Sequence, residues 1–319
     1  MANADTTPSR LGQINATGDA YALFLKKFAG EVLTTFTTEN IMTPLHTVRT
    51  ISNGKSAQFP VTGIASAKYH VAGQSILDAG NTYLSAIKHG ERVISIDNLL
   101  LSSTFIARID EAMNHYDVRS IYSTELGRAL AKKFDQTVLK VLIKAASAAE
   151  VFTGSGSGTI LNKGTSVTTG ANLAAAIYEA AQTLDEKNVP SDGRFVVVKP
   201  AEYYALIQEL SAPSKPSPVG SYTDGSVAVI GGVRVYKSNN LPTTNTGSQE
   251  TGTNTNYEGD FTNTVAVVSH KAAVGTVKLL DLAVESEYQL THQGTLMVAK
   301  YAMGHGSLRP ETVVVIKKS

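Results

Sequence analysis

Apolar residues recur at helical spacing along one long stretch of the chain, from Asp117 to Ala149. They fall every three or four positions and no proline interrupts them, so the stretch predicts a single amphipathic helix. Asp117 suits the N-cap, because its carboxylate can accept hydrogen bonds from the free N–H groups of the first turn. Such a helix would be about 50 Å long, well above the usual globular length. Its predicted apolar stripe is Ile121, Leu126, Leu130, Phe134, Val138, Val141 and Leu142, and its polar row is Arg128, Lys132, Gln136, Lys140 and Lys144.

The segment before this helix predicts a long β-hairpin between Gly63 and Asp97. Ile64–Val71 alternates loosely between apolar and polar residues, Gly73–Asn81 is rich in turn residues, and Ile87–Ile96 returns as the second strand. Two strands alone are only marginally stable in water. Because the segment holds no third strand, we expect the hairpin to lie on another surface, supplied by a second copy of the chain.

The remaining N-terminal residues predict an extended arm with little structure of its own. Residues 1–18 are small and polar and are predicted to be disordered. Residues 20–36 predict a short helix with an apolar face, and residues 47–61 predict an arm that ends in a strand. Between the hairpin and the long helix, the spacing of apolar residues over 105–113 predicts another short helix.

The second half of the chain has the pattern of an α/β region followed by strands. A Gly/Ser/Thr-rich segment, residues 153–166, predicts a linker into this region. The sequence Gly304-His305-Gly306 predicts a tight turn in which at least one glycine has positive φ. Helices are predicted over 171–184 and from Pro200, strands over 195–198, 233–236, 264–268, 282–288, 294–302 and 313–316, and loops over 211–226 and 241–260.

Composition narrows the classes of function. The chain has 319 residues, 42% of them hydrophobic, a formal net charge of +1 and no cysteine. This charge argues against tight, charge-driven binding of nucleic acid, and the absence of cysteine excludes disulfides and cysteine chemistry. Charged residues interrupt the apolar run over 21–36, so it does not predict a membrane span. We expect a soluble protein that stays in the cytoplasm where it is made.

Candidate catalytic and binding motifs are weak. The glycines of Gly154–Gly158 follow a helix and lack the Gly-Lys-Ser/Thr ending of a phosphate loop, so a linker is favoured. The seven histidines show no helical metal-site spacing. His115 could be a general base, but capping or packing is favoured. The adjacent carboxylates Asp110-Glu111 and Asp185-Glu186 point to different helix faces and predict solvated charges. The sequence therefore predicts no catalytic, cofactor-binding or metal site, and no enzyme.

Six stretches, at both ends of the chain, give a specific resemblance. The sequence resembles the major capsid proteins of short-tailed phages of the T7 type, which have the HK97 shell fold. Residues 153–263 match that family poorly. The matching stretches are Ala22–Lys26 with Gly30–Thr34, Val48–Ile51 with Gly54–Val61, Ile87–His89 with Val93, Glu111–Ser120, Val274–Leu279 with Asp281–Ala283, and Ala299–Gly306 with Leu308–Pro310.

The resemblance implies an α+β fold with four parts. These are an N-terminal arm over 1–57, an extended hairpin loop over 58–98, a peripheral domain with the long spine helix over 99–150 and 279–300, and an axial domain over 151–278 and 301–319. Some relatives cross-link lysine to asparagine between subunits. Lys88 lies in the hairpin, but nothing in the sequence singles it out for that chemistry.

The resemblance also implies function and partners. The expected function is a structural subunit that forms hexamers and pentamers in an icosahedral head around double-stranded DNA, contacted independently of sequence. A scaffolding protein during assembly and a portal protein at one vertex are implied, with no membrane. The location would be the virion, after assembly in the cytoplasm of a bacterial host. Two alternatives stay open: a cellular compartment of the same fold that encloses protein cargo, and an enzyme that uses the α/β region.

Overall fold

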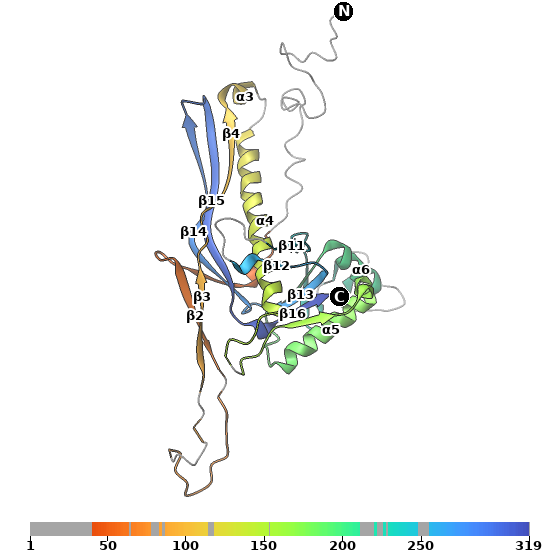
Figure 1. Ribbon diagram of the computed structural model, residues 1–319. Coiled ribbons are helices and arrows are strands. Elements are labelled where there is room, and N and C mark those ends of the chain that lie inside the picture. The colour runs from red at the N-terminus through yellow and green to blue at the C-terminus, as the bar shows by residue number, and fades with distance from the viewer. Residues whose placement is uncertain are drawn as a thin grey trace, which may run out of the picture. The chain divides into compact units, whose positions relative to one another are not determined.

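The computed structural model is a mixed α+β chain, shown in Figure 1. The predicted polar segment 1–18 and helix 20–36 lie outside the residues that it describes. The described residues are 40–63, 65–77, 83–84, 87–113, 118–152, 154–210, 220–221, 226–227, 229–247 and 255–318.

The chain divides into two compact units, which we call unit 1 and unit 2. In its described part, unit 1 comprises Leu100–Lys132 and Asp281–Tyr301. Unit 2 comprises Asn40–Leu99, Lys133–Leu280 and the chain from Ala302 onward. Each unit is therefore assembled from segments that are far apart in the sequence.

The predicted long helix is confirmed as α4 (Val118–Ala146). Leu130, Phe134 and Val138 are buried along the predicted apolar stripe, and Lys132 is exposed. Asp117, the predicted N-cap, lies outside the described residues. The helix ends three residues before the predicted end, at Ala146. The apolar spacing alone was thus sufficient to place the buried face of this element.

Unit 1 holds an antiparallel strand pair that corrects one prediction. Residues 100–107 form strand β4 (Leu100–Ala107), so the expected helix is limited to α3 (Arg108–Met113). β4 pairs with β15 (Gly294–Ser307) from Leu100↔Tyr301 to Ala107↔Gly294. In β4, Phe105 is exposed and Ile106 is buried, as strand alternation requires. Pairing with a distant strand has overridden a local spacing that also fitted a helix.

A six-stranded sheet forms the core of unit 2, with the order β5-β16-β13-β6-β10-β9. Helices α5 (Gly170–Glu186) and α6 (Pro200–Leu210) share one hydrophobic core with it, and Figure 1 shows α5 beside β16. These helices and the buried strands β6, β13 and β16 were predicted and are confirmed. The strands are β5 (Thr159–Asn162), β6 (Arg194–Val198), β9 (Val229–Ile230), β10 (Val233–Lys237), β13 (Thr264–His270) and β16 (Val313–Lys317).

Strand β5 corrects the predicted linker over residues 153–166. It pairs in parallel with β16, from Val314↔Thr159 to Lys317↔Asn162. The backbone before β5 favours glycine at these positions, because Gly154 and Gly156 have positive φ values of 96° and 86°. A Cβ on Gly158 would lie 2.3 Å from the carbonyl oxygen of Ala145. This glycine run is therefore a tightly packed connection from α4 into the sheet.

The predicted turn at Gly304-His305-Gly306 is wrong. β15 continues through all three residues to Ser307, and neither glycine is among the described glycines with positive φ. A Cβ on Gly304 would lie 2.1 Å from the Ser95 carbonyl oxygen, and one on Gly306 would lie 2.9 Å from Ile94 Cγ1. Glycine is needed here because another strand approaches closely, rather than because the chain turns.

The hairpin is present, but its first strand is not where the sequence predicted it. β2 (Ser56–Thr62) pairs antiparallel with β3 (His89–Ser95), from Ser56↔Ser95 to Thr62↔His89. The described residues over 65–77 contain no strand. β2 begins earlier because Ala57 and Val61 alternate inward, giving that segment a buried face.

The remaining elements connect these parts. β1 (Thr47–Thr50) pairs in parallel with β14 (Val274–Gln289), and together with β15 and β4 they form a four-stranded sheet of order β1-β14-β15-β4. Two small ribbons fall in the predicted loops. These are β7 (Gly220–Ser221) with β8 (Ser226–Val227), and β11 (Asn245–Thr246) with β12 (Gly259–Asp260). Short 3-10 helices are η1 (Thr43–Leu45), η2 (Thr165–Thr168), η3 (Thr255–Tyr257) and η4 (Pro310–Thr312).

Candidate functional site

The base of the hairpin belongs to the core of its own unit. Ala57 and Ile94 of the two strands pack with Val277 and Leu308 in one buried cluster. Further along the ribbon, a Cβ on Gly90 would lie 3.2 Å from the ring of Phe152. The expectation that the hairpin depends on another copy is therefore wrong for its base, because β14 and the chain after β15 already cover that part.

The distal part of the hairpin is different, and we call its described residues 65–77, 83–84 and 87–88 the hairpin loop. Tyr69 is 100% exposed and Leu77 is 79% exposed. Val71, Ile76, Leu84 and Ile87 are also exposed large hydrophobic residues. Soluble monomers seldom expose so much apolar surface in one place, and such a surface marks an interaction site.

Polar contacts within the hairpin loop give it local order. The phenol oxygen of Tyr83 accepts a hydrogen bond from the Val71 N–H at 3.1 Å and donates one to the Gln74 side chain. The His70 ring donates through Nε2 to the Gln74 carbonyl oxygen at 2.7 Å. These bonds join the two sides of the loop, so its apolar side chains are carried on a partly ordered segment.

Unit 1 presents a second exposed apolar surface on the edge strand β4. Leu101 and Phe105 lie on its outward face, with relative exposures of 56% and 43%. Beside them, Lys300 and Glu285 form an ion pair at 2.5 Å between β15 and β14. The mixture of exposed apolar and paired charged residues is typical of an intersubunit contact.

The structure places the candidate residues from the sequence as follows. His115 lies outside the described residues, as does the side chain of Glu111. Asp185 was expected to be a solvated charge, but its carboxylate pairs at 2.7 Å with Arg194, whose side chain is 4% exposed. Glu186 remains at the surface and accepts a hydrogen bond from Gln182 at 2.8 Å.

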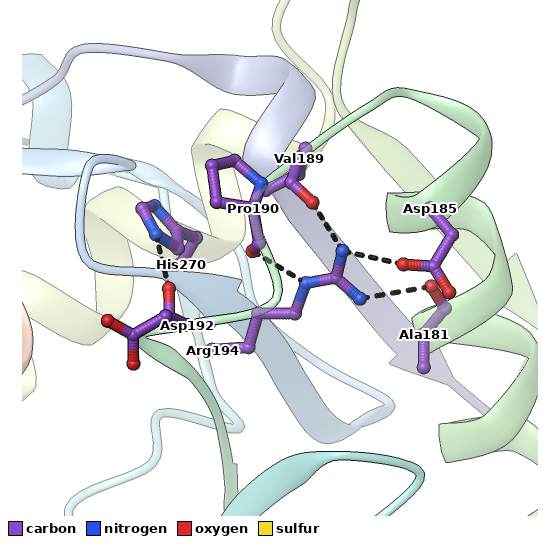
Figure 2. A network of polar contacts seen from close by, with 7 residues as sticks. All are labelled: Ala181, Asp185, Val189, Pro190, Asp192, Arg194 and His270. Carbon is purple, nitrogen blue, oxygen red and sulfur yellow. Dashed lines mark hydrogen bonds and ion pairs between the residues drawn. The ribbon is translucent and has the colours of Figure 1, made fainter.

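Arg194 is held by a network that Figure 2 shows in close view. Its guanidinium donates to the carbonyl oxygens of Pro190 (2.9 Å), Ala181 and Val189, in addition to Asp185. Four acceptors around one buried cation fix the loop between α5 and β6. The network is therefore structural, because four of the five N–H groups of the guanidinium donate to groups within the fold.

A cavity of about 360 Å³ opens next to this network, at the start of β6 and β10. Its lining includes Asp192, Arg234 and Lys271, which offer charge but no nucleophile beside a base. The wall is fixed by His270, which donates through Nε2 to the Asp192 carbonyl oxygen at 2.8 Å and accepts the Ala272 N–H on Nδ1 at 3.1 Å. Burial, the largest cause, lowers the pKa of His270.

A buried polar cluster in unit 2 was not predicted at all. Thr276 bonds the His46 ring at 2.7 Å and the His305 ring at 2.8 Å, although the three residues are far apart in the sequence. Nearby, the buried carboxylate of Asp135 accepts the backbone N–H groups of Ile41 and Met42 at 3.1 and 3.2 Å. Burial raises the pKa of Asp135. No sequence spacing could have joined these residues, because three separate strands and loops bring them together.

The described residues also bear on metal sites and membrane spans. No group of three His, Asp or Glu side chains among them could hold a metal ion. None of their helices combines the length and the apolar content that a bilayer crossing requires.

Comparisons with known proteins identify the family. The sequence profile of the Gp10A-like major capsid proteins matches residues 58–317. The major capsid protein of Escherichia phage T7 is 37% identical over 320 residues, which cover 93% of this chain and 92% of that protein. This chain belongs to the Gp10A-like major capsid protein family.

Other relatives of this Gp10A-like chain agree. The major capsid protein of Enterobacteria phage T3 is 34% identical over 330 residues, covering 96% of this chain and 94% of that protein. The capsid structure of the cyanophage P-SCSP1u superposes with a TM-score of 0.79 at 41% identity, covering 98% of this chain and 99% of that one. The predicted family and α+β capsid fold are thereby confirmed.

Family membership also decides between the functional alternatives. Gp10A-like proteins are structural shell subunits of phages, so the chain is a capsid component of the virion and not an enzyme. The same finding disfavours the alternative of a cellular cargo compartment. The functional residues of such a protein are surfaces rather than catalytic groups, and the hairpin loop and the β4 face are the strongest candidates among the described residues.

Proposed function

We propose that this capsid protein assembles as hexamers and pentamers into an icosahedral phage head around double-stranded DNA, with the hairpin loop as a main intersubunit tie. The observation that carries the proposal is the contrast within one hairpin. Its base is buried against Val277 and Leu308, whereas its distal apolar residues, such as Tyr69 and Leu77, are left exposed by the described part of the subunit. Burial of each such side chain is worth about 1.5–3 kcal/mol, which a neighbouring subunit would gain on assembly.

We also propose a domain organisation with four parts. Residues 1–57 would form an N-terminal arm and residues 58–98 the extended loop. Residues 99–150 and 279–300 would form the peripheral domain, and residues 151–278 with 301–319 the axial domain. The exposed β4 face lies in the proposed peripheral domain and is a suitable seat for a neighbour's loop, because both surfaces are rich in apolar side chains.

The proposed partners follow from the family. A scaffolding protein would guide assembly, a portal protein would occupy one vertex, and assembly would take place in the cytoplasm of a bacterial host. Packaged DNA would be contacted through its phosphates, which carry no sequence information. These contacts would be weak overall, because the subunit has a formal net charge of only +1.

A loop deletion tests the intersubunit tie. Replacing Ala65–Ser85 with a short Gly-Ser turn leaves both strands and the buried base intact, so the subunit should keep its circular dichroism spectrum and a cooperative melt. Electron microscopy and sedimentation should then show soluble subunits or small oligomers in place of shells. Normal-sized shells from this variant would contradict the tie. Loss of folding would show that the distal loop belongs to the subunit core.

A further inference from the structure

Three distant segments of unit 2 meet at the hydroxyl of Thr276, and we call His46, Thr276 and His305 the histidine relay. His46 follows η1, Thr276 lies on β14 and His305 lies on β15. The relay continues to Met42, whose carbonyl oxygen lies 2.6 Å from His46 Nδ1. The two rings and the hydroxyl therefore join the start of the described chain to both long strands.

The direction of every hydrogen bond in the relay follows from the bond between His46 and the Met42 carbonyl oxygen. A carbonyl oxygen only accepts, so His46 Nδ1 must carry a proton and donate to Met42. In neutral His46, Nε2 is then an acceptor, and the Thr276 hydroxyl donates to it. Because that hydroxyl proton is used, Thr276 Oγ1 accepts from His305 Nδ1. The relay is complete with one proton on each ring and leaves no free place for another along this chain of bonds.

The surroundings of the relay do not accommodate charge. Phe134 of α4 packs against both rings, with centroid distances of 5.7 Å to His46 and 5.0 Å to His305. The residues His46, Thr276 and His305 are 8%, 0% and 2% exposed. A charged imidazole in such a site loses its hydration, and no carboxylate of the described residues hydrogen-bonds either ring to replace it.

Four segments place charged or polar groups near the relay: β14, α4, η3 and the residues after β3. Lys278 on β14 acts on His46 as a like charge, and each histidine ring would repel the other once both were charged. Asp135 on α4 faces the Met42 backbone rather than either ring. On the far side, Tyr257 of η3 accepts the His305 backbone N–H at 3.1 Å and donates to Asp97, after β3, at 2.5 Å.

We propose that the histidine relay is an acid-sensitive lock: at neutral pH it holds residues 40–46, and the residues that follow β3, in place against β14 and β15. A proton added to His46 Nε2 turns that nitrogen into a donor, so Thr276 must turn its own hydroxyl proton away from the ring, and a proton added to His305 leaves a charged ring against Phe134. Either event weakens the relay. Because the Tyr257 hydroxyl bonds both the His305 backbone N–H and the Asp97 carboxylate, the residues after β3 loosen together with residues 40–46.

The sign of the pH effect follows from burial. Burial, and secondarily the charge of His46, lowers the pKa of His305 to about 3. Burial also lowers the pKa of His46, with Lys278 contributing, although the bond to Met42 acts the other way. A histidine whose pKa is lower in the folded state than in the unfolded state stabilises the fold fully above the unfolded value, about 6.5. That stability is lost progressively as the pH falls from about 6.5 toward 3.

The effect of Asp135 on stability has the opposite pH dependence, and the experiment must distinguish it from the effect of the relay. The pKa of Asp135 is raised by burial, so acidification alone favours its folded form. Its protonation nevertheless removes charge from the carboxylate that accepts Ile41 and Met42. For this reason the test follows the histidines directly and compares a histidine variant with an exposed histidine control.

The experiment uses the full-length subunit between pH 7.5 and 3.5. Histidine NMR should show both relay rings as neutral Nδ1–H tautomers at pH 7, and neither should titrate near 6.5. Hydrogen-exchange protection factors, corrected for the intrinsic pH dependence, should fall at least tenfold for the Met42 and His305 amides before the α5–α6 region is affected. In His305→Asn the side-chain amide replaces the Nδ1 donor without titrating, so the fall should shift to lower pH by about one unit. His292→Asn, on an exposed turn, should behave as the unchanged chain.

Two results would contradict the proposed lock. Titration of His305 near its ordinary pKa, or equal protection profiles for the unchanged chain and His305→Asn, would overturn the lock. If His305→Asn does not fold, the NMR titration of the unchanged chain decides alone. The inference rests on the proposed function only for a second readout, acid disassembly of shells. If the subunits lose exchange protection in acid but never form shells, the proposed assembly would be contradicted and the relay would not.

Discussion

The six-stranded sheet and the β2–β3 hairpin, both in unit 2, place their apolar residues in opposite surroundings. In the sheet, the central strands β6, β13 and β16 are buried on both faces, with α5 and α6 contributing to the same core. In the hairpin, burial ends at the base and large apolar residues beyond it face solvent. The apolar residues of the sheet are buried within one chain, whereas we propose that those of the distal hairpin are buried by a neighbouring subunit. Folding and assembly can therefore be perturbed separately.

The largest effect on folding is expected from Phe134→Asp. The change removes a buried aromatic ring that packs on His46 and His305 and leaves a charge with no partner. The expected loss is at least about 4 kcal/mol, enough to abolish soluble protein. Lys132→Asp, on the exposed side of the same helix, should change the free energy of unfolding much less. Equal damage from both, measured by soluble yield and chemical denaturation, would mean that the helical phase is wrong.

A smaller loss is expected from Gly304→Ala. The added Cβ would lie 2.1 Å from the Ser95 carbonyl oxygen, so β15 and the end of β3 must separate, at a cost of about 1–3 kcal/mol. Gly127→Ala is the matched control, since a Cβ there meets nothing within 4 Å on α4. It should instead stabilise the helix by about 0.5–1 kcal/mol. Thermal unfolding that ranks the two variants in the other order would contradict the close approach of the strands.

Asp185→Asn should cost about 1 kcal/mol. It removes the carboxylate that pairs with buried Arg194, but three carbonyl acceptors remain and the Asp185 side chain is 69% exposed, so that solvent screens the pair. Glu186→Gln, the next residue along the helix, should leave the free energy of unfolding within about 0.5 kcal/mol of the original. Urea titration of the two variants checks the difference, and identical values would show that the ion pair adds nothing.

The smallest effect on the subunit is expected from Tyr69→Ser, because that side chain is fully exposed. The free energy of unfolding should change by less than about 0.5 kcal/mol. Shell yield in sedimentation should nevertheless fall, since the tyrosine is proposed to be buried by a neighbour. Tyr178→Ser, half-exposed on α5, controls for general loss of surface aromatics. Unchanged shell yield for Tyr69→Ser alone would weaken the case for the hairpin loop.

The comparison also shows what the sequence could predict. Periodicity placed α4, α5 and the buried strands, because in these elements each residue's surroundings follow from its own neighbours along the chain. It failed for Phe105 and Ile106, whose spacing fits a helix and a strand equally, and pairing with β15 decided between them. It failed again at Gly304, where the need for glycine comes from Ser95 on another strand.

The candidate site also has parts that the sequence could predict and parts that it could not. An unpartnered hairpin was predictable from the lack of a third strand, and the family resemblance assigned it to assembly. The coverage of its base by Val277 and Leu308 was not predictable, because those residues come from the other end of the chain. The histidine relay was invisible for the same reason, since 230 positions separate His46 from Thr276.

Three elements of the fold cross the boundary between the two units. α4, β14 and β15 each run without interruption from one unit into the other, because the boundary falls inside them, at residues 132, 280 and 301. A cut of the chain at any of these three positions would therefore break a helix or a strand. The two units cannot be separated there without destroying an element that both of them share.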